Sequence, residues 1–239
     1  MTGVREVVFD GRESWLNWRL GKATGSILKD LISARGDGVK TAIYRLAAES
    51  LIGPAAIAEA DLSAMEVMER GHELEGPAIR RFQEETGKKV SHKLVGWESL
   101  DDPRMAVSPD GVIGKTQAVE VKCLLAAKHM EAFHTKAIPK NTGGYEEQAA
   151  QYFIVNGMLR TLYYVFYHPD FPAGMDFFYL TFTRKEMKDE IARLEALERA
   201  AVAKVREIVN AASLYSAEDL EKLKARREEL AEPVTTESV

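Results

Sequence analysis

The chain has 239 residues, 46% of them hydrophobic and 29% charged, which is typical of a soluble globular protein. No apolar run approaches the roughly 18 residues that a membrane span needs, and the N-terminus lacks the apolar core of a secretory signal, so we expect a cytoplasmic protein without a membrane partner. The net charge of −5 argues against a protein that coats nucleic acid through bulk positive charge. The single cysteine, Cys123, excludes an internal disulfide, a multi-cysteine zinc site and an iron–sulfur cluster.

The first third of the chain is predicted to be mainly helical. Helices are expected over residues 13–20, 24–34, 40–51 and from 62 onward. Thr24-Gly-Ser26 is typical of a helix N-cap. Gly76-Pro77 is expected to kink or restart the fourth helix, because proline has no N–H to donate, and Gly87 suits the C-terminal stop of that helix.

The rest of the chain alternates between strands and helices. Strands are expected over residues 89–98, 105–107, 111–113, 118–123, 161–167 and 177–182, and helices over 127–135 and 145–156. Thr183-Arg-Lys-Glu186 is a capping-box pattern before a long helix, and Ser216 begins a last one. We therefore predict an α/β fold with a central mixed sheet, in a single domain over residues 1–231 with a core at about 15–182, C-terminal helices at about 184–231 and a disordered tail at 232–239.

Two carboxylates and a lysine predict a metal-dependent nuclease site. Glu120 and Lys122 are two residues apart on a predicted strand, so both side chains leave the same face, while Val121 points into the core. Asp110 lies ten residues before Glu120, at the end of a neighbouring strand. Such carboxylates suit Mg²⁺ or Mn²⁺, which polarises a phosphate and acidifies bound water. Lys122 would orient that water or balance charge, and helical Glu75 would align water or hold a second metal.

A second group of residues predicts an anion pocket. Arg19, Thr24, Gly25 and Ser26 supply a cation, hydroxyl donors and backbone N–H groups at a predicted helix N-terminus, where the helix dipole favours anions. Arginine can grip phosphate with paired donors, and a terminal 5′-phosphate carries more charge than an internal one. The alternative is that Thr24 and Ser26 only cap the helix and that Arg19 is an ordinary surface residue.

Five blocks of the chain, in order and within residues 15 to about 168, resemble the lambda exonuclease (YqaJ-like viral recombinase) branch of the PD-(D/E)xK nucleases. They are Trp18-Arg-Leu-Gly-Lys-Ala-Thr-Gly-Ser26, Gly71-His-Glu-Leu-Glu75, Ser108-Pro-Asp-Gly111, Glu120-Val-Lys-Cys123 and Tyr145-Glu-Glu-Gln148. The Glu-x-Lys block is weakly specific by itself, whereas the first and third blocks together are strongly specific. The resemblance implies a restriction-endonuclease-like core with extra C-terminal helices.

The same resemblance implies the activity and the partners. It implies a Mg²⁺-dependent 5′-to-3′ exonuclease on linear double-stranded DNA, with Mn²⁺ as a substitute and no nucleotide cofactor. The enzyme would degrade the 5′-phosphorylated strand and leave 3′ overhangs for a single-strand annealing protein, in phage-type recombination within a bacterial or phage-infected cell. The resemblance also implies a homotrimeric ring, which would keep an acidic protein on its DNA.

Residue roles in catalysis follow from the resemblance as well. Asp110 and Glu120 match the metal ligands together with the Val121 backbone carbonyl, and Lys122 matches the catalytic lysine. Glu75 and Gln148 match helix-borne residues around the site. The alternative for Gln148 is a solvent-facing helix residue.

The resemblance also assigns residues to the DNA end. Residues matching Arg19, Ser26 and Ser108 line the 5′-phosphate pocket. Lys128 falls where the family has an arginine, and lysine keeps the charge but loses the planar fork. Met68 lies where the family places an apolar wedge that splits the end base pair, although it could equally be a core residue. Arg35 is expected to reach the minor groove.

Two other function classes compete with the exonuclease. An endonuclease or resolvase could use the same catalytic core and would also cut circular DNA. A catalytically silent DNA-binding scaffold is disfavoured, because such a protein does not need Asp110, Glu120 and Lys122 together.

Overall fold

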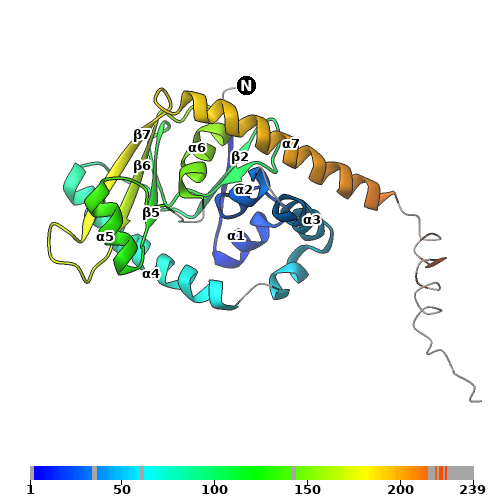
Figure 1. Ribbon diagram of the computed structural model, residues 1–239, viewed down its shortest axis with the longest axis horizontal. Coiled ribbons are helices and arrows are strands. Elements are labelled where there is room, and N and C mark those ends of the chain that lie inside the picture. The colour runs from blue at the N-terminus through cyan, green and yellow to red at the C-terminus, as the bar shows by residue number, and fades with distance from the viewer. Residues whose placement is uncertain are drawn as a thin grey trace, which may run out of the picture.

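The computed structural model describes residues 3–33, 37–59, 62–140 and 144–214, with 219, 221, 222 and 224, and without the side chains of 57–70 (Figure 1). Its helices are α1 (Arg12–Arg19), α2 (Gly25–Ile32), α3 (Asp37–Ile52), the 3₁₀ helix η1 (Gly53–Glu59), α4 (Leu62–Thr86), α5 (Ala126–Thr135), α6 (Tyr145–Val155) and α7 (Lys188–Ser213). Its strands are β1 (Val4–Val8), β2 (Val95–Ser99), β3 (Ala106–Val107), β4 (Gly111–Ile113), β5 (Gln117–Lys122), β6 (Thr161–Tyr167) and β7 (Phe177–Thr183).

A mixed four-stranded sheet positions the central part of the chain. Its strand order is β4-β5-β6-β7, with β5 and β6 parallel and the other two pairs antiparallel. The register places Glu120 opposite Tyr164 and Lys122 opposite Phe166. A parallel pair needs a crossover connection, which here contains α5 and α6. The predicted α/β fold with a mixed sheet and surrounding helices is confirmed.

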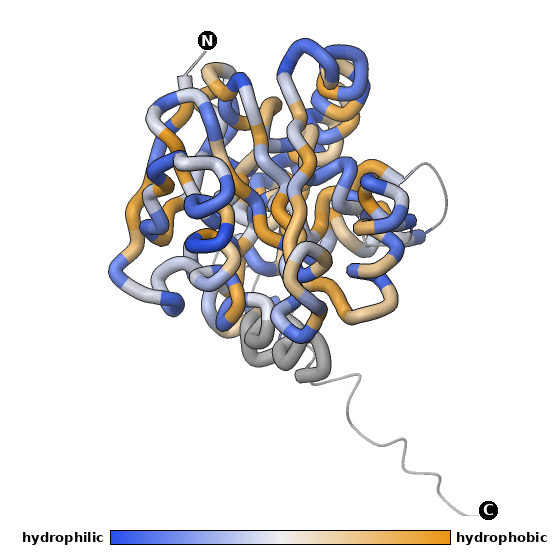
Figure 2. The backbone as a smooth tube through the Cα atoms, turned by 90° about the vertical axis from the view of Figure 1, so that its left-hand side faces the viewer, coloured by the Kyte–Doolittle hydropathy of each residue, from blue (hydrophilic) through white to orange (hydrophobic). Residues whose placement is uncertain are grey.

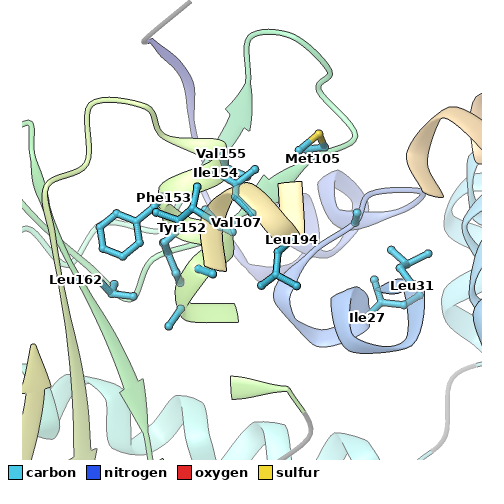
Figure 3. Close-up of a cluster of buried hydrophobic side chains, with 14 of the residues drawn as sticks. Ile27, Leu31, Met105, Val107, Tyr152, Phe153, Ile154, Val155, Leu162 and Leu194 are labelled. Atoms are coloured by element: carbon cyan, nitrogen blue, oxygen red, sulfur yellow. The ribbon is translucent and has the colours of Figure 1, made fainter. Parts of the chain in front are cut away.

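The two faces of this sheet are covered by different helices. Val119 and Val121 pack with Ala78, Ile79 and Phe82 of α4 in one buried cluster. The opposite face meets α6, whose residues from 149 to 155 are all buried, in the larger core that also includes Leu162 and Leu194 (Figure 3). Val121 thus points into the core, as predicted, while Glu120 and Lys122 leave the other face.

A second, three-stranded antiparallel sheet with the order β1-β2-β3 lies beside the first. The sequence did not predict β1, because its two charged residues, Arg5 and Glu6, obscure the alternation of a buried strand. The strand expected over 89–98 is shorter than predicted. Only Val95–Ser99 pairs as β2, and Ser91 makes an isolated bridge to Val112 instead.

Helix α4 bears on two predictions. It runs as one helix from Leu62 to Thr86 with Pro77 inside it, so of the two outcomes predicted at Gly76-Pro77, a kink or a restart, the restart does not occur. Proline removes one backbone hydrogen bond, and the buried residues Ile79 and Phe82 anchor the helix immediately after it. Gly87 adopts a φ of 68° and donates its N–H to the Gln83 carbonyl at 2.8 Å, which is the predicted C-terminal stop.

Helix α7 packs along the core with one apolar side. The hydrogen bonds of the predicted capping box form, with Thr183 N donating to Glu186 Oε2 (3.1 Å) and Glu186 N donating to Thr183 Oγ1 (3.3 Å), but they close the turn before α7, whose N-cap is Met187 without a side-chain bond. Hydrophobic and hydrophilic residues alternate along the chain, as elements with one buried side require (Figure 2).

The predicted last helix from Ser216 and the tail at 232–239 fall almost wholly outside the described residues. Within the described part of the chain, every helix is too short or too polar to cross a membrane.

Candidate active site

A cleft of about 600 Å³ gathers segments that are far apart in the sequence. Its walls come from α1, α4, β5 and α6 and from the loops before α1, β2 and β4. All five residues that the sequence predicts to be catalytic line it, namely Glu75, Asp110, Glu120, Lys122 and Gln148. The three sequence segments that carry the predicted carboxylates therefore converge.

Three hydrogen-bond donors hold the Glu120 carboxylate. Its Oε1 accepts from Lys122 Nζ at 2.7 Å and from Gln148 Nε2 at 2.8 Å. Its Oε2 accepts from the hydroxyl of Tyr152 on α6. Glu120 is only 4% exposed, so these donors take the place of water around a buried charge.

Asp110 is held against the same strand. Its Oδ2 accepts a hydrogen bond from the Val121 N–H at 2.6 Å, which places this carboxylate beside the Val121 peptide group. Burial raises the pKa of Asp110 well above its usual value, and the nearby carboxylates of Glu120 and Glu75 raise it further. A divalent cation would relieve this repulsion.

Glu75 enters the cleft from α4. Its Oε2 lies 3.1 Å from His72 Nδ1, one helical turn earlier. Burial raises the pKa of Glu75, and the neighbouring imidazole of His72 opposes that rise. A carboxylate with a raised pKa, next to Asp110 and Glu120, suits proton exchange with water or ligation of a cation.

Lys122 remains an ammonium in this setting. Burial alone would lower its pKa, but Glu120, Tyr145 and Asp110 outweigh burial and raise the pKa above the usual value. Its Nζ lies 2.8 Å from Gln148 Oε1 and 4.2 Å from the centre of the Tyr145 ring. Lys122 can thus donate hydrogen bonds and balance negative charge.

The donor set fits a hard divalent cation that keeps several water or phosphate ligands. Glu120 and Asp110 supply carboxylate oxygens, and the Val121 peptide lies beside them. Within the described residues, no three acidic, imidazole or thiol side chains are close enough to form a complete metal site. Mg²⁺ is commonly held by one or two carboxylates with the remaining positions left to water and substrate.

Arg19 forms the second part of the site. Its Nη2 donates to Ser26 Oγ at 2.9 Å and lies 3.2 Å from Thr24 Oγ1, and its guanidinium stacks 4.6 Å from the centre of the Trp15 ring. Thr24 precedes α2 as predicted, but its hydroxyl makes no capping bond. The alternative in which Thr24 caps the helix through its side chain is therefore wrong.

Ser108 and Gly25 connect the Arg19 pocket with the part of the cleft that holds the carboxylates. Ser108 Oγ accepts from Trp15 Nε1 at 2.8 Å and donates to the Val95 carbonyl at 2.7 Å. A Cβ on Gly25 would lie only 2.6 Å from Gln148 Cγ, so only glycine lets α2 begin against Gln148. Gln148 is therefore a contact of both parts of the site, and it is not a solvent-facing helix residue.

Of the three remaining residues predicted to contact the DNA end, one lies away from the cleft and the side chains of the other two are not described by the structure. Lys128 Nζ is paired with Glu131 Oε2 at 2.7 Å and donates to the Lys140 carbonyl at 2.9 Å, and it is not among the described residues that line the cleft. Arg35 lies outside the described residues. Met68 belongs to α4, but its side chain is not described.

Several residues of the site were missed by the sequence analysis. Tyr152 is buried behind the cleft on the face of α6 that also carries Tyr145 and Gln148, and this shared face was the one available signal for it. Basic side chains on the rim could have been found from the run Lys88-Lys-Val-Ser-His-Lys93, which supplies His92 and Lys93 to the cleft next to Arg12 of α1.

Known proteins resemble this chain in sequence and in fold. An alkaline exonuclease, LHK-Exo, from Laribacter hongkongensis superposes with a TM-score of 0.70 at 25% identity, covering 92% of this chain and all of that one. The structure of the same protein in complex with dAMP superposes with a TM-score of 0.65 at 25% identity, covering 84% of this chain and 98% of that one. A phage-related exonuclease from Haemophilus somnus 129PT shares the fold, with a TM-score of 0.53 at 14% identity and coverage of 78% and 95%.

Comparison at the sequence level identifies the family. No curated protein sequence matches the chain significantly. The family description of the YqaJ-like viral recombinase domain matches residues 14–158, which include most of α1, the cleft carboxylates and α6. Since this match covers more than half of the chain, the chain belongs to the YqaJ-like viral recombinase family.

Proposed function

We propose that the protein is a divalent-metal-dependent exonuclease that degrades the 5′-phosphorylated strand of linear double-stranded DNA. The observation that carries this proposal is the convergence of Asp110, Glu120 and Lys122 in one cleft beside the Arg19 pocket. Family membership and the similarity to an alkaline exonuclease support it. The dAMP complex of LHK-Exo also supports it, because a mononucleotide is the product expected of an exonuclease.

Asp110, Glu120 and the Val121 carbonyl would hold Mg²⁺, with Mn²⁺ as a substitute. The bound cation would stabilise negative charge on a phosphate oxygen and lower the pKa of a bound water. Lys122 donates hydrogen bonds to the reacting oxygens and balances the charge of the transition state. Glu75 aligns the attacking water or holds a second cation. No nucleotide cofactor is needed for this chemistry.

Arg19, Thr24 and Ser26 would bind the terminal 5′-phosphate, with Ser108 beside them. The hydrogen bonds that now join Arg19 to the two hydroxyls would be exchanged for bonds to phosphate oxygens. Lys128 would have to break its ion pair with Glu131 before it could bind the phosphate.

Further DNA contacts are proposed away from the chemistry. Met68 would act as the wedge and Arg35 as the minor-groove contact. The rim side chains Arg12 and Lys93, together with His92, give the acidic protein a local basic track for the DNA backbone.

The resulting 3′ overhang would be passed to a single-strand annealing protein, and the enzyme would act as a homotrimeric ring.

Digestion of linear duplexes labelled at either the 5′ or the 3′ end, with Mg²⁺ and with a chelator, tests activity, cofactor and polarity together. We expect the label at the 5′ end to be released first, only with the metal. Asp110→Ala is the inactive control.

A circular duplex in the same assay distinguishes the competing classes. An exonuclease leaves it intact, whereas an endonuclease or resolvase linearises it. Binding of both substrates without cleavage, with Mg²⁺ or Mn²⁺ present, would favour the silent scaffold.

A further inference from the structure

Donors within the protein occupy most of the hydrogen-bond acceptor positions on the Glu120 carboxylate. A carboxylate offers about four acceptor positions, two on each oxygen. Lys122 Nζ and Gln148 Nε2 occupy both positions of Oε1, at 2.7 and 2.8 Å. The Tyr152 hydroxyl occupies one position of Oε2. The remaining position for a cation is therefore on Oε2, the oxygen that Tyr152 contacts.

The Tyr152 hydroxyl is itself rigidly placed. The residue is 0% exposed on α6, and its ring packs edge-on against Trp97 with ring centres 6.4 Å apart. The hydroxyl oxygen also lies 2.9 Å from the Ser108 carbonyl oxygen. A phenol has one proton and faces two acceptors here, and the contact with Glu120 is the closer one.

We propose that Tyr152 is a positioning residue for metal binding. Its hydroxyl holds Glu120 Oε2 in the orientation that leaves one electron pair of this oxygen directed at the cation. The inference rests on the proposed function, because it assumes that Glu120 is a metal ligand. Groups that orient a ligand in this way commonly change metal affinity or activity by about 10- to 100-fold when they are removed.

Tyr152→Phe tests this role because it removes the hydroxyl and keeps the ring in the core. Mn²⁺ binding, measured by calorimetry without DNA, should weaken at least about tenfold. In DNA digestion, the Mn²⁺ concentration for half-maximal rate should rise by a similar factor, and saturating Mn²⁺ should restore most of the rate. Equal Mn²⁺ affinity, or tighter binding, in Tyr152→Phe would overturn the proposal.

Two control variants make the result specific. Tyr163→Phe removes a hydroxyl on β6 that donates to Gln117 Oε1 at 3.3 Å, away from the carboxylates, and should leave Mn²⁺ affinity unchanged. Glu120→Gln should lose Mn²⁺ binding. Circular dichroism of all variants verifies the fold, and if Tyr152→Phe unfolds, Tyr152→Met replaces it as an apolar substitute under the same expectations.

Failure of the proposed function gives a different pattern. If the parent protein binds no Mn²⁺ and does not digest linear DNA, the metal-dependent nuclease itself is wrong. If the parent binds and digests while Tyr152→Phe matches it, only the role of Tyr152 is wrong.

Discussion

Lys122 Nζ lies 2.7 Å from Glu120 Oε1 on its own strand and 2.8 Å from Gln148 Oε1 on α6. The ammonium therefore joins a buried acid of β5 to helix α6. Because its pKa is raised by Glu120, Tyr145 and Asp110 against the effect of burial, it stays charged near neutral pH. The position suits a group that stabilises negative charge on a reacting phosphate.

Replacing this ammonium should remove catalysis while leaving the fold. Lys122→Ala is expected to lower the rate of linear DNA digestion by at least about a hundredfold, because a charge that stabilises the transition state is lost. The rate is measured on a labelled duplex with saturating Mg²⁺. Lys115→Ala, an exposed lysine in the turn between β4 and β5, is the matched control and should digest normally. Parental activity in Lys122→Ala would contradict the assigned role.

Arg19→Ala should chiefly affect the choice of DNA end. The guanidinium lies beside two hydroxyls, where a terminal phosphate can replace them as acceptor. We expect the preference for 5′-phosphorylated over 5′-hydroxyl ends to fall by about tenfold or more. The assay compares the two ends on otherwise identical duplexes, and Arg45→Ala, at an exposed side chain of α3, is the control. A uniform loss on both ends would place Arg19 outside the pocket.

Gly25→Ala tests the contact between the two parts of the site. The new Cβ would meet Gln148 Cγ at 2.6 Å, so the amide must move away from Glu120 and Lys122. We expect the turnover rate to fall by about tenfold, since small misplacements near reacting groups are costly. Gly38→Ala, which has open space around its Cβ, should leave the rate unchanged. Thermal denaturation of both variants separates a local effect from unfolding.

Glu198 predicts how stability changes with pH. Burial raises its pKa from 4.5 to about 8, and its Oε1 accepts from Gln151 Nε2 at 2.6 Å. The folded chain therefore keeps a proton that the unfolded chain releases, so the free energy of unfolding falls as the pH rises from about 4.5 to about 8.

Glu198→Gln should remove this dependence. At pH 9 the variant should be more stable than the parent by more than about 1.4 kcal/mol, the equivalent of one pKa unit, and at pH 5 the two should be similar. Urea midpoints at the two pH values measure the difference. Glu207→Gln, at a 67% exposed side chain of the same helix, should show no such gain. A gain that is the same at both pH values would show that Glu198 is not protonated in the folded chain.

The assembly makes a further prediction. Light scattering at working concentration is expected to give three subunits per particle, because an acidic protein that encloses its DNA does not need a strongly basic surface. A monomer at the same concentration would contradict the ring, while leaving the chemistry of the cleft unaffected.

The sequence predicted those parts of the site that depend on local geometry. A period of two places Glu120 and Lys122 on one face of a strand and Val121 on the other, and the structure confirms this arrangement. The hydrogen bond from the Val121 N–H to Asp110 could not be predicted, because it depends on how β4 enters the sheet. Tyr152 was missed for a related reason. An aromatic residue in an apolar helix looks like core, and only tertiary packing shows that its hydroxyl reaches a carboxylate.

The position of β5 between β4 and β6 determines how the cleft loses its structure. Amides of this strand are expected to exchange with deuterium only when most of the molecule opens, whereas the short helix α1, which carries Arg19 and has no buried residue, can detach at lower cost. Mild heating would thus erase discrimination between DNA ends before it erases the ability to hold a cation.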